Sequence, residues 1–118
     1  MAITVLVDAR NVLRSKWPNI PERELVELCC AWAADAGHRA VIVFDGKAPG
    51  GLLGEHDAAP GCVVVGTGRE SADDWLAREA VGYEPFWLVT SDHELRARAG
   101  ARAQNVLGGG SFARTLAP

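Results

Sequence analysis

The sequence has no excess of positive charge and no long apolar run. Twelve lysines and arginines stand against 15 aspartates and glutamates, which gives a formal net charge of −3. This balance argues against a protein that binds nucleic acid through general basicity, but it is compatible with an enzyme whose acidic site is neutralised by metal ions. The longest apolar runs fall far short of the roughly 20 residues that span a bilayer. No charged segment followed by an apolar one opens the chain, so we expect no signal peptide.

Cysteine is also scarce. The three cysteines are Cys29, Cys30 and Cys62. An odd number with two adjacent members does not fit the disulfide framework of a secreted protein, and no Cys/His spacing typical of a metal site is present. We therefore expect a cytoplasmic protein with reduced thiols.

The chain does contain alternating strand-like and helix-like segments. Short, nearly continuous apolar runs predict strands that are buried on both faces, and these runs cover residues 3–7, 40–44, 62–65, 86–89 and, more weakly, 103–107. Apolar residues at helical spacing predict a helix over Glu22–Ala36. Shorter helices are expected over 71–80, over 92–99 and after Ser111.

This alternation predicts an α/β fold. We expect one domain over residues 1–118, built as a three-layer α/β/α sandwich around a central, mostly parallel sheet of about five strands. The Gly- and Pro-rich stretch 46–61 is expected to be one long loop, which is either functional or mobile. The three glycines of Gly108–Gly110 are expected to form a flexible hinge before the last helix.

Aspartates follow the predicted strands. Asp8, Asp45 and Asp92 each come just after a strand, and Asp73 and Asp74 open the helix after the third strand. Because the carboxyl ends of parallel strands share one edge, five carboxylates are expected to converge there. Adjacent carboxylates repel each other, so such a cluster requires raised pKa values or a bound cation. A ligand set made only of oxygen suits Mg²⁺ or Mn²⁺.

Each aspartate also has a purely structural explanation. Aspartate is a common helix N-cap and turn residue. Asp45 precedes a glycine, as in a good turn, and the segment from Ser71 to Asp74 resembles a capping box. Asp8 is the hardest to explain in this way, because no turn glycine follows it, and Asp74 is the easiest.

Four blocks of residues match a known family in order along the chain. They are Val5–Val12, Val41–Gly46, Ser71–Asp74 and Val89–Arg96. Together they resemble a NYN domain of the YacP-like branch of the PIN-like nuclease superfamily. The resemblance implies a PIN-like fold and a metal-dependent endoribonuclease that uses Mg²⁺ or Mn²⁺. Its core metal-binding and catalytic acids would be Asp8, Asp73 and Asp92, with Asp45 assisting and Asp74 as a further candidate ligand.

The same resemblance implies roles for polar neighbours of these acids. Asn11 would orient Asp8 or contact a phosphate. Thr90 and Ser91 would hold their loop in place and reach a ligand or a metal-bound water.

Basic residues flank the same predicted edge. Arg10, Lys47, Arg69 and Arg96 are candidates for binding the RNA backbone. Arg10 departs from the family, which usually has an aromatic residue or Asn at this place, and the departure bears on substrate choice. Trp17 could stack on a base, although a single loop tryptophan more often packs over a helix end.

Two other functions remain open at this point. A non-catalytic module that binds RNA or the ribosome could have the same fold, although a pure binder would not need to keep the acids. A phosphatase or nucleotide-binding protein could have a similar sheet. The phosphatase is disfavoured, because its chemistry in the HAD-like family needs a second Asp two residues after the first, where this chain has Arg10.

Overall fold

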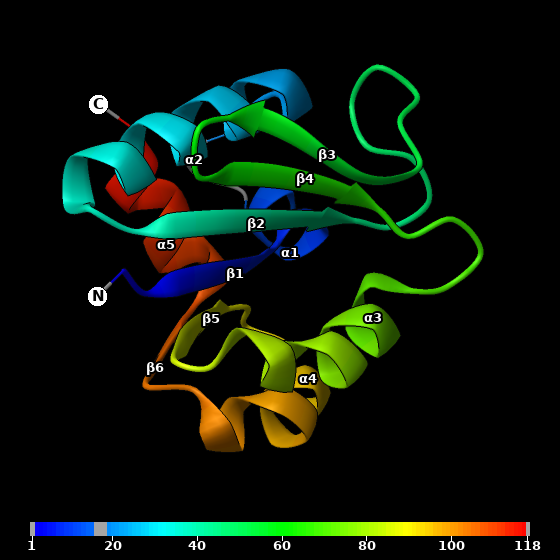
Figure 1. Ribbon diagram of the computed structural model, residues 1–118, viewed down its shortest axis with the longest axis vertical. Helices are drawn as coiled ribbons and strands as arrows, with labels where there is room; N and C mark the ends of the chain where they lie inside the picture. The colour runs from blue at the N-terminus through cyan, green and yellow to red at the C-terminus, as the bar shows by residue number, and fades with distance from the viewer. Residues whose placement is uncertain (1, 16–18, 118) are drawn as a thin grey trace.

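The computed structural model describes residues 2–15 and 19–117, so Trp17 lies outside the described residues. The elements, in chain order, are β1 (Thr4–Asp8), α1 (Ala9–Leu13), α2 (Glu22–Ala36), β2 (Arg39–Phe44), β3 (Gly54–Ala59), β4 (Cys62–Gly66), α3 (Ala72–Glu79), the 3₁₀ turn Ala80–Tyr83, β5 (Phe86–Val89), α4 (His93–Ala99), the 3₁₀ turn Gly100–Arg102, β6 (Asn105–Leu107) and α5 (Gly109–Leu116) (Figure 1). Over these ranges no helix combines the length and the apolar character that crossing a membrane would need.

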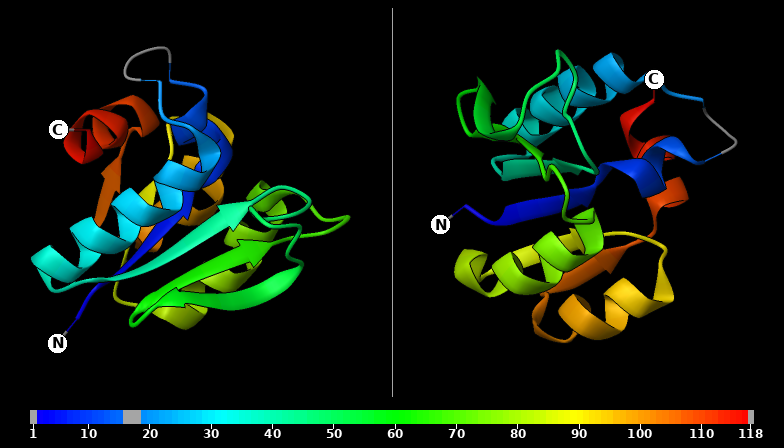
Figure 2. Two further views of the ribbon diagram at one scale, coloured as in Figure 1. Left: turned by 90° about the horizontal axis from the view of Figure 1, so that it is seen from above. Right: turned by 90° about the vertical axis from the view of Figure 1, so that its right-hand side faces the viewer.

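The strands form one twisted sheet in the order β3-β4-β2-β1-β5-β6. Only β3 runs antiparallel to its neighbour, and the other pairs of neighbouring strands are parallel. Helices cover both faces, with α1, α2 and α5 on one side and α3 and α4 on the other (Figures 1 and 2). The predicted α/β fold with a mostly parallel central sheet is confirmed, with six strands in place of about five.

The central strand β1 shows how the sequence builds two cores. All five of its residues are buried. Val5 and Val7 pack in the core beneath α2 and α5, whereas Leu6 packs in the core beneath α3 and α4. This follows from the alternation of side chains along a strand. Burial on both faces explains why β1 reads as a continuous apolar run and not as an alternating one.

The expectation of one long loop over 46–61 is wrong for its second half. Gly54–Ala59 forms the edge strand β3, which pairs with β4. Five of its six residues are exposed, so no buried face imposed an apolar pattern that would have revealed the strand. The first half is packed closely: a Cβ on Gly66 would lie 2.2 Å from the carbonyl oxygen of Leu52.

The flexible hinge expected at Gly108–Gly110 is also wrong. Gly108 precedes α5, and Gly109 and Gly110 form its first turn. Gly109 is buried, and its lack of a side chain lets the helix approach α1 closely. A Cβ at this position would lie 2.2 Å from Asn11 Oδ1.

The cysteines differ from expectation as well. A disulfide between Cys30 and Cys62 links α2 to the first residue of β4, so the prediction of reduced thiols is wrong for this pair. The sequence separation of 32 residues gave no local signal that the two would meet. Cys29 is free and buried, and this burial raises the pKa of its thiol to about 12.

Candidate active site

The candidate site lies at the carboxyl ends of the parallel strands. The arrows of β2 and β4 point toward the side of the molecule where α3 begins (Figure 1). A cleft of about 150 Å³ opens there, and its lining contains both acidic and basic side chains. The residues that line it are Asp8, Arg10, Asn11, Arg14, Asp45, Ser71, Asp73 and Asp92.

Asp8 ends β1 and is the most enclosed acid of the cleft. Only 4 % of its surface is exposed. Thr90 Oγ1 donates a hydrogen bond of 3.0 Å to Asp8 Oδ2, and the backbone of Asn11 also bonds the carboxylate. Burial raises the pKa of Asp8 from 3.8 to about 6, and the nearby charges of Asp73 and Asp45 add to the rise, while the two hydrogen bonds oppose it.

Asp45 follows β2 and ties it to α3. Its Oδ1 accepts a hydrogen bond of 2.9 Å from the backbone N–H of Ala72, at the start of α3. Its Oδ2 lies 3.9 Å from Arg10 Nη1. The carboxylate is therefore oriented by a helix N-terminus and faces a cation at the mouth of the cleft.

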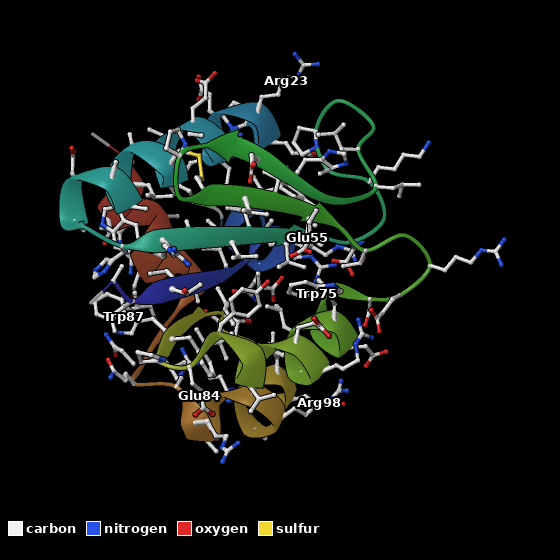
Figure 3. The ribbon with its side chains drawn as sticks, viewed as in Figure 1. Arg23, Glu55, Trp75, Glu84, Trp87 and Arg98 are labelled. Atoms are coloured by element: carbon white, nitrogen blue, oxygen red, sulfur yellow. A yellow bond between two sulfur atoms is a disulfide. The ribbon has the colours of Figure 1, made fainter. Side chains whose placement is uncertain are left out.

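Asp73 and Asp74 are adjacent in the first turn of α3 but have different surroundings. Asp73 lines the cleft, and its pKa is raised by partial burial and by the charges of Asp92 and Asp45. Asp74 accepts a hydrogen bond of 2.8 Å from Arg98, whose side chain lies beside α3 and α4 (Figure 3). This bond lowers the pKa of Asp74, which is outside the lining of the cleft.

Asp92 is the N-cap of α4. Its Oδ1 accepts a hydrogen bond of 2.9 Å from the backbone N–H of Leu95, and its own N–H donates to Thr90 Oγ1 over 3.1 Å. Thr90 is completely buried and thus connects Asp92 to Asp8. Asp92 therefore caps α4 and lines the cleft at the same time, so its structural role does not remove it from the candidate site.

A layer of hydrogen bonds behind the cleft fixes the β5–α4 loop. Asn11 Oδ1 accepts from the backbone N–H of Ser91 over 2.8 Å. Ser91 Oγ accepts from the N–H of Gly109 over 2.9 Å. Arg96 Nε donates to the carbonyl oxygen of Thr90 over 2.8 Å. Asn11, Ser91 and Arg96 therefore hold the backbone around the acids.

The remaining basic candidates lie at different distances from the acids. Arg10 lines the cleft, Lys47 lines a neighbouring hollow, and Arg69 is an exposed residue of the β4–α3 loop outside both linings. The sequence interpretation did not include Arg14 or Ser71 among the site residues. Arg14 is the C-cap of α1, a short helix that had not been expected, and Ser71 had been assigned only as the N-cap that it also is.

Comparisons with known proteins identify the architecture. No protein-family model matches the sequence. The nitrogen fixation protein FixI of Rhizobium meliloti (strain 1021) is 35% identical over 81 residues, which are 67% of this chain and 11% of FixI. The chain thus spans about a ninth of the length of this relative.

Solved structures match over nearly the whole chain. Rae1 (YacP) from Bacillus subtilis superposes with a TM-score of 0.71 at 20% identity, covering 98% of this chain and 74% of Rae1. A mutant form of Rae1 gives the same TM-score at 17% identity and covers 97% of this chain. The chain has a YacP-like fold. The YacP-like fold implied by the four sequence blocks is confirmed.

The donor set of the cleft is suited to a hard cation. All four acids offer oxygen, and the pKa values of Asp8 and Asp73 are raised partly by neighbouring carboxylates, which is the electrostatic condition that a cation relieves. Over residues 2–15 and 19–117, no three His, Cys, Asp or Glu side chains are arranged to hold an ion together. Mg²⁺ commonly takes only one or two carboxylates and keeps several waters, so its binding here would not require three of these side chains as direct ligands.

Proposed function

We propose that the chain is an endoribonuclease that depends on Mg²⁺ or Mn²⁺ and hydrolyses phosphodiester bonds at this cleft. The observation that carries the proposal is the convergence of Asp8, Asp45, Asp73 and Asp92, which come from four separate segments of the chain. Burial of Asp8 with a pKa raised to about 6 adds weight, because perturbed acids in a cleft are typical of functional sites. The YacP-like fold supports a nuclease-like or RNA-related role.

In this proposal Asp8 and Asp73 hold the cation. When bound, it would polarise a phosphoryl oxygen and lower the pKa of a bound water. Thr90 and the Asn11 backbone keep the Asp8 carboxylate in one orientation, which reduces the cost of organising the site. Asp45 and Asp92 are each oriented by a backbone N–H at a helix start, and they complete the acidic wall that the solvated ion contacts.

Arg10 supplies positive charge at the mouth of the cleft. Its guanidinium lies 3.9 Å from Asp45 and is 60% exposed, so it can exchange this weak ion pair for a phosphate oxygen. Arginine is well suited to that contact because its planar fork matches phosphate geometry. RNA is the proposed substrate and partner.

The adjacent pair Asp73 and Asp74 provides a matched test. We expect Asp73→Asn to lower metal-stimulated RNA cleavage by more than roughly 100-fold, because even outer partners of metal ligands cost 10- to 100-fold when changed. Asp74→Asn removes a carboxylate from the same helical turn, outside the cleft, and should cleave like the wild type. Cleavage would be measured on structured and unstructured RNA after chelation and return of Mg²⁺ or Mn²⁺.

The outcome also separates the two RNA-related functions. Wild-type protein that leaves every RNA intact with either metal contradicts the nuclease. If that protein still binds RNA, and the Asp73→Asn variant binds equally well, the chain is instead a non-catalytic module that binds RNA or the ribosome. Loss of cleavage in the Asp74→Asn variant as well would contradict the placing of Asp74 outside the site.

A further inference from the structure

A second hollow adjoins the carboxylate cleft. Its volume is about 340 Å³. It shares Arg10, Arg14 and Asp45 with the cleft, and its other lining residues are Leu13, Glu22, Phe44 and Lys47. The two arginines belong to the segment that starts with α1, and Lys47 follows β2. The hollow therefore continues the cleft along α1, with a shared wall and a different chemical character.

The cations of this hollow are available for a ligand. Arg14 and Lys47 are exposed, and within the described part of the chain neither forms an ion pair. Three other exposed arginines are engaged with carboxylates: Arg78 with Glu70 and Glu79, Arg98 with Asp74, and Arg102 with Glu84. In a molecule with a net charge of −3, unpaired cations gathered around one hollow favour an anionic ligand.

The acids of the hollow leave this positive character in place. Asp45 accepts a hydrogen bond from Ala72 and faces Arg10, so its charge is already offset. Glu22 lies in the first turn of α2, where the helix dipole stabilises a negative charge. Two apolar residues, Leu13 and Phe44, also line the hollow. The lining thus combines a cationic rim with an apolar surface.

We propose that this hollow binds the nucleotide next to the scissile phosphodiester of a single-stranded RNA. Arg14 and Lys47 contact its phosphate, and Leu13 and Phe44 pack against its sugar or base. The volume lies at the lower end of the range for small-ligand pockets, which fits one nucleotide unit and not a duplex. Single strands are the form of RNA whose bases can be turned into such a site. The inference rests on the proposed nuclease function.

Binding of a short RNA tests the hollow separately from cleavage. The probe is a fluorescein-labelled single-stranded RNA of about eight nucleotides, a length within the site sizes of single-strand binders. Binding is measured by fluorescence anisotropy with the Asp8→Asn protein, so that the RNA is not cleaved during the measurement. In this background, Arg14→Ala with Lys47→Ala should weaken binding about tenfold and reduce the salt slope by about 0.7 for the lost phosphate. Arg39→Ala, an exposed arginine at the first residue of β2, is the matched control and should change neither quantity.

A scan of the RNA backbone locates the contact. Methylphosphonate linkages remove the charge of one phosphate at a time. Neutralising one particular phosphate and making the Arg14→Ala and Lys47→Ala double change should each weaken RNA binding. At that linkage the two losses of binding free energy should not add, because both changes remove the same interaction. Additive losses at every linkage, or a double variant that binds like Arg39→Ala, would overturn the proposal. Arg14, Lys47 and Arg39 are exposed, and thermal melting checks that each variant folds.

The two proposals fail in different ways. If wild-type protein cleaves RNA and the double variant has an unchanged KM and salt slope, the hollow is not a subsite and the nuclease stands. If wild-type protein cleaves nothing but the non-additive linkage is found, the hollow binds a nucleotide of single-stranded RNA and the nuclease function is wrong. A double variant that cleaves with a raised KM and an unchanged kcat supports both.

Discussion

At the scale of single residues, Asp8 carries the largest cost of building the cleft. A carboxylate with 4 % exposure loses most of its hydration, and the hydrogen bonds from Thr90 and the Asn11 backbone recover only a part of it, because the pKa still rises to about 6. Functional sites are often kept in such unfavourable states by the rest of the fold. The same residue that serves the proposed chemistry should therefore destabilise the metal-free protein at neutral pH.

The stability of the metal-free protein should fall as pH rises. The folded-state pKa of Asp8, about 6, lies above its ordinary value of 3.8, so the folded protein binds more protons than the unfolded chain between these values. The free energy of unfolding should drop from about pH 4 to just above pH 6, by up to about 3 kcal/mol. Urea unfolding at a series of pH values in the presence of a chelator measures this trend. The other titrating groups are the same in the wild type and in an Asp8 variant, so their contribution cancels in the difference between the two proteins.

Asp8→Asn provides the comparison for this trend. The amide keeps the size of the side chain and carries no charge, so the variant should show a flatter dependence on pH and a higher stability than the wild type near pH 7. Added Mg²⁺ should stabilise the wild type and have little effect on the variant. An equal slope in the two proteins would contradict the buried, raised pKa.

At the scale of elements, the sequence predicted those segments whose burial imposes a pattern. The helix over Glu22–Ala36 has the predicted bounds, and the parallel strands followed from their apolar runs. The edge strand β3 did not, because it is exposed and pairs through its backbone. The helix α1 has only five residues, too few for a periodic apolar pattern.

The candidate site was predictable to a similar degree. Parallel topology alone brings Asp8, Asp45 and Asp92 to one edge. It does not decide between Asp73 and Asp74, because adjacent helical residues point in directions about 100° apart and the rotation of α3 about its axis is set by packing. The close contact of Gly109 with Asn11 could not be predicted from the sequence, because a glycine in a flexible hinge and a glycine in a close contact give the same sequence pattern.

The docking of α5 against α1 gives a prediction at this scale. In Gly109→Ala, the new Cβ would lie 2.2 Å from Asn11 Oδ1 and 3.0 Å from its carbonyl oxygen. We expect α5 to shift and the hydrogen bonds of Ser91 to Asn11 and Gly109 to weaken. The free energy of unfolding should fall by about 1–3 kcal/mol, as in overpacked cores, and the rate of RNA cleavage should fall with it. Thermal unfolding and initial cleavage rates measure the two effects.

The next residue is the control. In Gly110→Ala, the nearest atoms to the new Cβ would be Ser15 Oγ at 3.4 Å and Arg114 Nη1 at 3.5 Å, an ordinary separation. Alanine also favours a helix over glycine by roughly 0.5–1 kcal/mol. This variant should keep its activity and equal or exceed the wild type in stability. Similar behaviour of both variants would show that α5 does not hold the site through Gly109.

At the scale of the whole molecule, the disulfide restricts the conformations that the unfolded chain can adopt. Cys30 and Cys62 are 32 residues apart, and closing such a loop lowers the entropy of the unfolded state, which corresponds to about 3–4 kcal/mol of stability. Cys62 is the first residue of β4, so the bridge lies at the opposite end of that strand from the cleft. The bridge should therefore affect stability far more than catalysis.

Reduction tests this separation. Dithiothreitol should lower the melting temperature of the wild type while leaving its rate of RNA cleavage at room temperature nearly unchanged. A variant with Cys30→Ser and Cys62→Ser should melt at a lower temperature with or without the reductant. A wild-type melting temperature that does not respond to the reductant, with both thiols accessible to alkylation, would contradict the bridge.

The contact between Asn11 and Gly109 has a consequence for how the protein is made. Chains emerge from the ribosome N-terminus first, so Asp8 and Asn11 appear before Asp92, the Ser91 loop and Gly109, which allows α5 to pack against α1. A nascent chain lacks part of the acidic wall and its support until the residues up to Gly109 have been translated. If the proposed activity is correct, the enzyme cannot cleave RNA before that stage of its own synthesis.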